Sequence, residues 1–343
     1  MLEAQRHSCE MAGSALYSEI LEVVAADVRA KGQFGELLAP VGDAPYADAV
    51  GLRLLAGLHR LVLEGLAPEL AAHYPSVGGS LRGRESLRAG LLSVLGAQRP
   101  ALDDAVRANV QTNEVGRCVA LLGGFIEASE FGFPLRILEV GASAGLNLWF
   151  DRYRYDAGGI SFGPANSALR FNEPWASEPP NLASRVLVQE RLGCDANPID
   201  LTTPKGALML RSFVWADQLN RLSRLDAALD AVESCPFVVE RADALDWLRP
   251  QLGSRVTGTT TVVFHSIVMQ YLGHRQRAEL VSVIEAAGAE ATSDSPLCWL
   301  RFEPGGDQAT LRLTMWPAGE SRVLATSAYH GPPVVWRPRL ATS

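Results

Sequence analysis

The chain has almost no lysine. Among 343 residues, Lys31 and Lys205 are the only lysines in a total of 31 basic residues, and the formal net charge is −7. The sequence therefore lacks the basic surplus that binding to a phosphate backbone requires, and we expect no nucleic-acid partner. The other cations are arginines, whose planar guanidinium group suits carboxylates and phosphates.

Cysteines and long apolar runs are also scarce. The five cysteines are scattered, and no two have the spacing of metal ligands. We therefore expect no bound metal and a reduced, cytoplasmic environment. No apolar run is long enough to cross a bilayer, and the N-terminus lacks the basic-then-apolar order of a signal peptide, so we expect no membrane partner. The sequence leaves the oligomeric state open.

What the sequence does contain is apolar material for a large core. Its composition is 48% hydrophobic, and its length favours two domains. Apolar residues at helical spacing predict an all-helical N-terminal domain over 1–132. From 133 to 343, short apolar runs alternate with helical segments, which predicts an α/β domain with a parallel sheet. An insertion is expected at about 151–194.

The strand pattern of the second domain changes near its end. Buried strands are predicted at 135–140, 237–240, 260–264 and 297–302. Two later runs, at 311–316 and 322–328, flank a Pro-Ala-Gly-Glu turn and predict a hairpin, which is antiparallel. A doubly wound, Rossmann-like sheet that ends in an antiparallel hairpin resembles the layout of class I methyltransferases, which use S-adenosylmethionine (SAM). A plain dinucleotide domain would stay parallel to its end.

The most informative stretch runs from Ile137 to Asn147. It predicts a strand, a turn of small residues and a helix over 144–150. Gly141 and Gly145 allow the backbone to bend and to approach a ligand closely. Glu139 would repel the pyrophosphate of a dinucleotide, but it suits a cofactor with a cationic amino-acid end. The stretch favours SAM over NAD, and tight packing of strand on helix is the alternative interpretation.

Several strings of the sequence resemble a known family. The family is an uncharacterised bacterial one of unknown function that is related to class I methyltransferases. The strings lie at 59–63, 111–117, 139–147, 151–155, 193–195, 262–266 and 311–317. The resemblance covers nearly the whole chain and implies the fold and SAM as the cofactor, but it supplies no substrate.

The methyltransferase resemblance implies a set of cofactor-binding residues. The first cofactor motif is matched by Glu139, Gly141, Ser143, Gly145 and Asn147, with Ser143 at the position of the usual middle glycine. That serine makes the backbone approach tighter, so the affinity for a cofactor is expected to be lower.

The resemblance also implies roles for two further acids. Asp195 resembles the acid that accepts both ribose hydroxyls, although it lies some fifty positions past Gly145, where about twenty is usual. A turn residue or a helix cap is an equally good interpretation of Asp195. Asp243 and Ala244 resemble the turn that contacts adenine, and Asp243 is as well explained as a cap of the helix that begins at Ala244.

Candidates for chemistry surround these positions. His265, at the end of a strand, is the first candidate for a general base, and a hydrogen-bonded structural histidine is the alternative. Glu114 is the second candidate. Asn113 and Arg117 are candidate substrate contacts, although Glu114 and Arg117 are three apart and so would be expected to pair. Tyr153 is a candidate substrate contact in a predicted anion clamp, with a solvated face as the alternative.

Three functions are compatible with these features of the sequence. The first is a SAM-dependent methyltransferase that acts on a small molecule, with the helical domain covering the cleft. The second is a module that binds SAM, its demethylated product or another nucleotide without methyl transfer. The third, an NAD-dependent oxidoreductase, is disfavoured by Glu139 and by the closing hairpin.

Overall fold

The chain forms two compact units. The computed structural model describes residues 2–42, 49–235 and 237–337. The helical unit comprises Met1–Thr112 and Leu201–Leu225, and the sheet unit comprises Asn113–Asp200 and Asp226–Ser343. Helices followed by a mixed sheet confirm the predicted α/β class. Residues 113–132, which helical spacing groups with the N-terminal helices, lie in the sheet unit.

The helical unit is built from amphipathic helices around one apolar core. Its helices are α1 (Leu2–Met11), α2 (Ala15–Arg29), α3 (Gln33–Leu38), α4 (Val50–Leu63), α5 (Pro68–Ala71), α6 (Arg84–Ala97), α7 (Arg99–Arg107) and α9 (Pro204–Phe213). Ser14 caps α2, because its hydroxyl accepts a hydrogen bond from the Tyr17 amide. A further helix, α10 (Leu219–Val232), begins in this unit and continues into the other.

His59 on α4 is a buried polar group of this unit. The side chain is fully buried. Its Nδ1 lies 3.2 Å from the Ser212 carbonyl oxygen and its Nε2 lies 2.8 Å from the Ser76 hydroxyl. Burial lowers the pKa of His59 to about 4. The imidazole is therefore a neutral, fully bonded part of the core.

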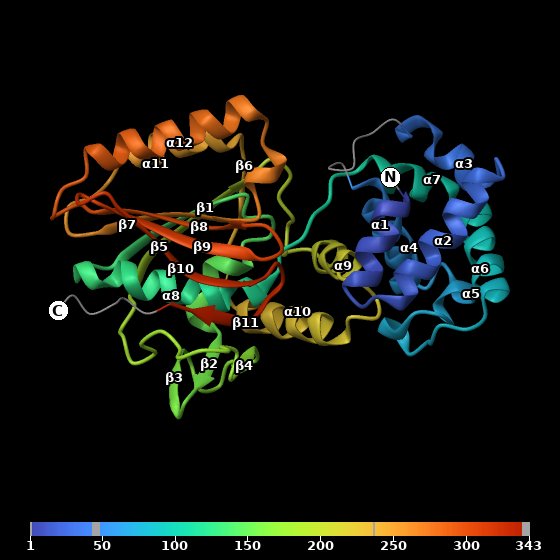
Figure 1. Ribbon diagram of the computed structural model, residues 1–343, viewed down its shortest axis with the longest axis horizontal. Coiled ribbons are helices and arrows are strands. Elements are labelled where there is room, and N and C mark those ends of the chain that lie inside the picture. Colours follow the sequence, from blue (N-terminus) through green and yellow to red (C-terminus); the bar gives the residue numbers. More distant parts are fainter. Residues whose placement is uncertain (1, 43–48, 236, 338–343) are drawn as a thin grey trace. The chain divides into compact units, whose positions relative to one another are not determined.

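The sheet unit contains one large mixed sheet (Figure 1). Its strands, in spatial order, are β11 (Gly331–Trp336), β10 (Glu320–Ala328), β9 (Ala309–Trp316), β8 (Leu297–Pro304), β7 (Thr260–Ser266), β1 (Leu135–Val140), β5 (Val188–Asp195) and β6 (Glu240–Arg241). The strands from β6 to β8 are parallel, and β9, β10 and β11 continue antiparallel. The predicted antiparallel ending is confirmed.

Helices cover both faces of this sheet. Every residue of β1 and β7 is buried, as expected for central parallel strands. On one face lies α8 (Cys118–Ala128), where Gly123 and Gly124 make room for the side chains of Trp336 and Leu300. On the other face lie α11 (Ala244–Gly253) and α12 (His274–Ala289), which share an apolar core with Trp299 (Figure 1).

The segment between β1 and β5 differs in part from the prediction. The helix expected over 144–150 is a 3-10 helix, η6 (Leu146–Arg152), and Trp149 inside it departs from helical dihedral angles. Phe150 of η6 stacks on Phe125 of α8 at 4.0 Å between ring centres. A small sheet of β2 (Arg154–Ala157), β3 (Ile160–Phe162) and β4 (Arg170–Asn172) follows, and the main sheet resumes with β5.

The described parts of the chain contain neither a metal-binding cluster nor a membrane-spanning helix. Among residues 2–42, 49–235 and 237–337, no three His, Cys, Asp or Glu side chains are grouped to hold a metal ion. No helix in those ranges is long and apolar enough to cross a bilayer. All five cysteines are free thiols.

Candidate functional site

The order of the parallel strands indicates where a ligand would bind. The chain passes from β1 to β5 and β6 on one side, and it returns to β7 and β8 on the other. The strand order therefore reverses between β1 and β7. In open α/β sheets, ligands bind outside the carboxyl ends of the strands at such a point. The predicted site residues Glu139, Asp195 and His265 lie at or next to the carboxyl ends of β1, β5 and β7.

The turn after β1 has a strained backbone, and hydrogen bonds to residues far along the chain hold it in place. Gly141, Ser143 and Gly145 all have positive φ angles, of 70°, 53° and 78°. Such an angle is uncommon for a residue with a Cβ, so Ser143 is the strained member of the three. The Ser143 amide donates to Asp195, and its carbonyl oxygen accepts from the Ile199 amide at 3.1 Å. The turn is therefore tied to the segment that follows β5.

Asp195, the last residue of β5, uses both carboxylate oxygens on backbone amides. Its Oδ2 accepts from the Ser143 amide at 2.9 Å, and its Oδ1 accepts from the Asn197 amide at 2.8 Å. The side chain is only partly buried. Because each carboxylate oxygen has a second lone pair, Asp195 can still accept from a ligand hydroxyl without releasing the turn.

Glu139 is the unusual group of the site. Its side chain is 1% exposed, and its Oε2 has no hydrogen-bond partner among the described residues. Burial raises the pKa of Glu139 well above its usual value, and the Asn147 side chain and the Arg117 charge oppose that rise. A buried carboxyl with an unused oxygen is costly unless it is neutral or meets a cation. This residue is therefore suited to a positively charged ligand group.

Three predicted site residues around η6, Asn113, Asn147 and Tyr153, form hydrogen bonds within the protein. The Asn113 Oδ1 accepts from the Leu146 amide at 2.8 Å, and the Tyr153 hydroxyl donates to the Leu146 carbonyl at 2.7 Å. The Asn147 Oδ1 lies 3.2 Å from the Cys118 thiol. Each of these contacts fixes the segment that follows the turn. Their predicted roles in binding cofactor or substrate stay predictions.

Glu114 and Arg117 belong to the same edge of the sheet. Glu114 caps η4 (Val115–Arg117) and Arg117 is its last residue; the Glu114 carboxylate accepts from the Gly116 amide at 3.1 Å. The Arg117 guanidinium donates to the Ser266 carbonyl oxygen at 2.9 Å and to the Tyr329 carbonyl at 3.1 Å. Arg117 therefore connects this segment to the carboxyl end of β7. The structure brings both residues to the predicted site.

His265 is held on both ring nitrogens. It is fully buried, its Nε2 accepts from the Trp299 indole at 3.1 Å, and its Nδ1 lies 2.6 Å from Glu303. Because an indole only donates, the proton of the neutral ring is on Nδ1 and points to Glu303. Glu303 also accepts from the Val268 amide at 3.0 Å. These contacts agree with the structural alternative, and the role of His265 as a base stays a prediction.

Asp243 caps α11. Its Oδ1 accepts from the Leu245 amide at 2.8 Å and from the Asp246 amide at 3.4 Å, and Ala244 is the first residue of the helix. The capping interpretation is therefore confirmed. It does not exclude contact with adenine, which stays a prediction for Asp243 and Ala244.

Protein side chains occupy the space that the two glycines leave. A Cβ on Gly141 would lie 2.5 Å from a methyl group of Val268, and a Cβ on Gly145 would lie 2.5 Å from the ring of Phe237. A ligand that uses the same close approach therefore has to displace Val268 and Phe237. Sequence reasoning missed both side chains, as it missed Glu303, because their contacts join segments far apart in the chain.

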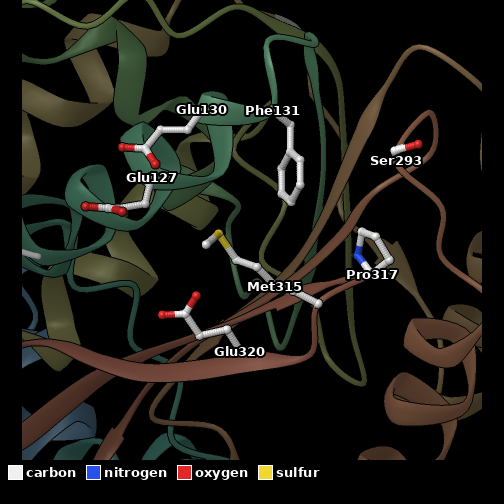
Figure 2. Close-up of a pocket in the computed structure, with 8 residues that line it drawn as sticks. Glu127, Glu130, Phe131, Ser293, Met315, Pro317 and Glu320 are labelled. Carbon is white, nitrogen blue, oxygen red and sulfur yellow. The ribbon is translucent and has the colours of Figure 1, made fainter. Parts of the chain in front are cut away.

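A separate pocket lies near the amino end of β8, beside the turn between β9 and β10 (Figure 2). Its volume is about 380 Å³, and it is lined by Glu127, Glu130, Phe131, Ser293, Met315, Pro317, Ala318 and Glu320. The turn between β9 and β10 forms one wall, and Trp316 before that turn pairs with Leu297, the first residue of β8. None of the predicted site residues lines this pocket.

Comparison with known proteins identifies the family and nothing more specific. No curated protein and no solved structure matches the chain. One family model, described as an uncharacterized protein conserved in bacteria (DUF2332), matches residues 1–336. Because the match spans almost the whole chain, the protein belongs to this bacterial family.

Proposed function

We propose that the protein is a SAM-dependent methyltransferase that acts on a small molecule. The cofactor would bind outside the carboxyl ends of β1, β5 and β7. The strand order β6-β5-β1-β7-β8 supports this location, because it places the reversal of strand order beside the turn after β1. The resemblance to class I methyltransferases supports the choice of cofactor.

The single observation that carries the proposal is the buried carboxyl of Glu139 with its unpartnered Oε2. A dinucleotide would bring a pyrophosphate to this turn, and an acid there would repel it. The amino-acid end of SAM brings an ammonium group instead. A cation within a few ångströms favours the ionised carboxyl, so binding would lower the raised pKa of Glu139.

Other residues fit the remaining parts of the cofactor. Asp195 has spare acceptor capacity on both oxygens for the ribose hydroxyls. Asp243 and Ala244, at the start of α11 and next to β6, would meet the adenine. When bound, SAM supplies an activated methyl group. The chain itself contributes orientation and exclusion of water, which account for much of the rate of such a transfer.

A general base is required only when the acceptor loses a proton. His265 has both ring nitrogens in hydrogen bonds inside the protein. Glu114 lies on the segment that Arg117 attaches to the carboxyl end of β7. Glu114 is engaged as well, because one carboxylate oxygen accepts from the Gly116 amide and the other lies 3.7 Å from His330 Nδ1. A carboxylate oxygen keeps a second lone pair for a proton, so Glu114 stays a candidate base.

Isothermal titration calorimetry tests the cofactor. We expect SAM and S-adenosylhomocysteine to bind the wild type, and 5′-methylthioadenosine, which lacks the amino-acid end, to bind at least about tenfold more weakly, the loss of roughly one charge-assisted hydrogen bond. Asp195→Ala should weaken the binding of all three ligands, because it removes the acceptor for the ribose hydroxyls and loosens the turn after β1. Asp307→Asn, at an exposed turn between β8 and β9, is the control. No binding of SAM to the wild type would refute the proposal.

A binding module without methyl transfer is the second candidate. The observation that favours it is the packing of Val268 and Phe237 against the two glycines, which reduces room near the cofactor. Val268→Ala distinguishes the two functions. If the packing only restricts entry, the variant should bind SAM more tightly, and turnover with a screened set of acceptors should rise with it. Tighter binding without turnover on any acceptor would favour the binding module.

A further inference from the structure

Two arginines face each other directly across neighbouring strands, and one of them, Arg301, pairs in register with His265 of β7. Arg301 on β8 pairs in register with Arg312 on β9. Residues opposite each other in an antiparallel pair project to the same face, and like charges in such a pair are destabilising. Arg301 is half-buried and Arg312 is exposed. The repulsion is therefore only partly screened by water.

Neither arginine has an acidic partner among the residues that the structure describes. Within 4.0 Å of either guanidinium, the described parts of the chain (2–42, 49–235 and 237–337) place no carboxylate. Glu285 on α12 raises the pKa of Arg301, and Glu303, two residues along β8, is committed to His265 and to backbone amides. In a chain with a net charge of −7, two adjacent cations without an ion pair are conspicuous.

The Arg301 guanidinium is held in one orientation. Its central carbon lies 3.9 Å from the centre of the Trp299 ring. One terminal nitrogen donates to the Thr314 hydroxyl at 2.7 Å and to the Ser321 hydroxyl at 3.4 Å. The buried Nε has no partner among the described residues. Burial and, after it, the charge of Arg312 lower the pKa of Arg301 to about 10. The group is thus positioned in advance while its charge is poorly compensated.

The chemistry of these groups matches an oxyanion. Guanidinium groups bind phosphate through strong charge-assisted hydrogen bonds. Thr314 and Ser321, which pair across β9 and β10, add two hydroxyls beside Arg301. A dianion would relieve the repulsion between the arginines and would supply the missing partner of both.

We propose that Arg301, Arg312, Thr314 and Ser321 form a binding site for a phosphate group, on the face of β8, β9 and β10 that α12 partly covers. The site lies on a face of the sheet beside His265, and the proposed cofactor would bind outside the carboxyl ends of β1, β5 and β7; no cofactor atom enters the phosphate proposal. The inference therefore does not depend on the proposed function. Inorganic phosphate and a phosphorylated small molecule share the chemistry that the site recognises.

The test uses the full chain in low-salt buffer without phosphate. Calorimetric titrations with sodium phosphate and with glycerol 3-phosphate should show binding, and both ligands should raise the melting temperature. Arg312→Gln should weaken binding about fivefold or more, the effect of losing one exposed charge contact. The same variant should melt at least about 1 °C higher than the wild type without phosphate, because the like-charge repulsion is gone. Arg88→Gln, an exposed arginine of the helical unit, is the matched control.

The two ligands separate the sources of the phosphate. Tighter binding of glycerol 3-phosphate would identify the site as one for a phosphorylated molecule, and equal binding would identify free phosphate as sufficient. The proposal is overturned if neither ligand binds at about 10 mM, or if Arg312→Gln and Arg88→Gln weaken binding equally. It is also overturned if Arg312→Gln lowers the melting temperature, since that result would show that the pair stabilises the free protein.

Discussion

Two buried titratable groups, His59 of the helical unit and Glu139 of the sheet unit, differ in their hydrogen bonding. In the helical unit, both ring nitrogens of His59 have hydrogen-bond partners. In the sheet unit, Glu139 keeps one carboxyl oxygen without a partner among the described residues. His265, one strand away from Glu139, resembles His59, because both of its nitrogens are bonded. Fully bonded groups serve the fold, whereas a buried group left unpaired at a ligand-binding edge indicates a binding role.

The largest expected effect concerns Glu139 and SAM. Glu139→Gln replaces a buried acid by its neutral isostere and removes the charge that the ammonium group would meet. We expect SAM to bind roughly 30-fold more weakly, which corresponds to about 2 kcal/mol for a charge-assisted hydrogen bond. Calorimetry on both proteins measures this. The affinity for 5′-methylthioadenosine serves as the control and should stay unchanged, and an equal loss for both ligands would indicate general damage to the site.

The next effect concerns His59 and acid. The folded pKa of His59 is lowered to about 4 from an ordinary value of 6.5. The stability that it contributes is therefore complete above about pH 6.5 and is lost as the pH falls toward 4. Between pH 7 and pH 5 we expect a loss of about 2 kcal/mol from this group. Urea unfolding across this range, compared between wild type and His59→Gln, measures it. An identical pH dependence in the two proteins would contradict the account.

Glu139 should make the free energy of unfolding depend on pH in the direction opposite to His59. Its folded pKa is raised by burial, so the native state holds a proton that the unfolded chain has already released. The free energy of unfolding should therefore fall as the pH rises from about 4.5 through the folded pKa, by at most about 1.4 kcal/mol per pH unit. Glu139→Gln should remove this slope. Unfolding of the two proteins between pH 5 and pH 8 would show curves that diverge with rising pH, and parallel curves would count against a neutral buried acid.

The smallest effect concerns Trp299. Trp299→Phe removes the indole donor to His265 Nε2 and keeps most of the ring. We expect a loss of about 1 kcal/mol in stability, the usual value for one hydrogen bond, and no change in SAM affinity. Chemical unfolding together with calorimetry tests both statements. A large loss of SAM affinity would show that His265 contributes to binding and is more than a structural residue.

Local pattern predicted the central strands well. The run at 135–140 coincides with β1, because strands buried on both faces are continuously apolar. The edge strand β11 was missed, because Pro332 and Pro333 argue against a strand in the sequence. In the structure β11 forms the edge of the sheet, where proline is tolerated.

The site was predictable in position but less so in detail. Glu139 and Asp195 end neighbouring parallel strands; strand pattern placed Glu139 there, and the resemblance to methyltransferases placed Asp195. The partners of His265 were not predictable, because Trp299 and Glu303 lie more than thirty residues away on the next strand. The helix expected after Gly145 is a 3-10 helix and not an α-helix. Aromatic packing of Phe150 on Phe125 holds that segment as a kinked 3-10 helix, which no local periodicity reveals.

The most direct test of the account is the proton balance of SAM binding at pH 6.5. Titration calorimetry in two buffers of different ionisation enthalpy gives the number of protons exchanged. If Glu139 is neutral in the free protein and ionises beside the ammonium group, about one proton is released per SAM bound. 5′-Methylthioadenosine should release none, and neither should SAM with Glu139→Gln. Binding of SAM without proton release, or equal release by the variant, would contradict the central claim.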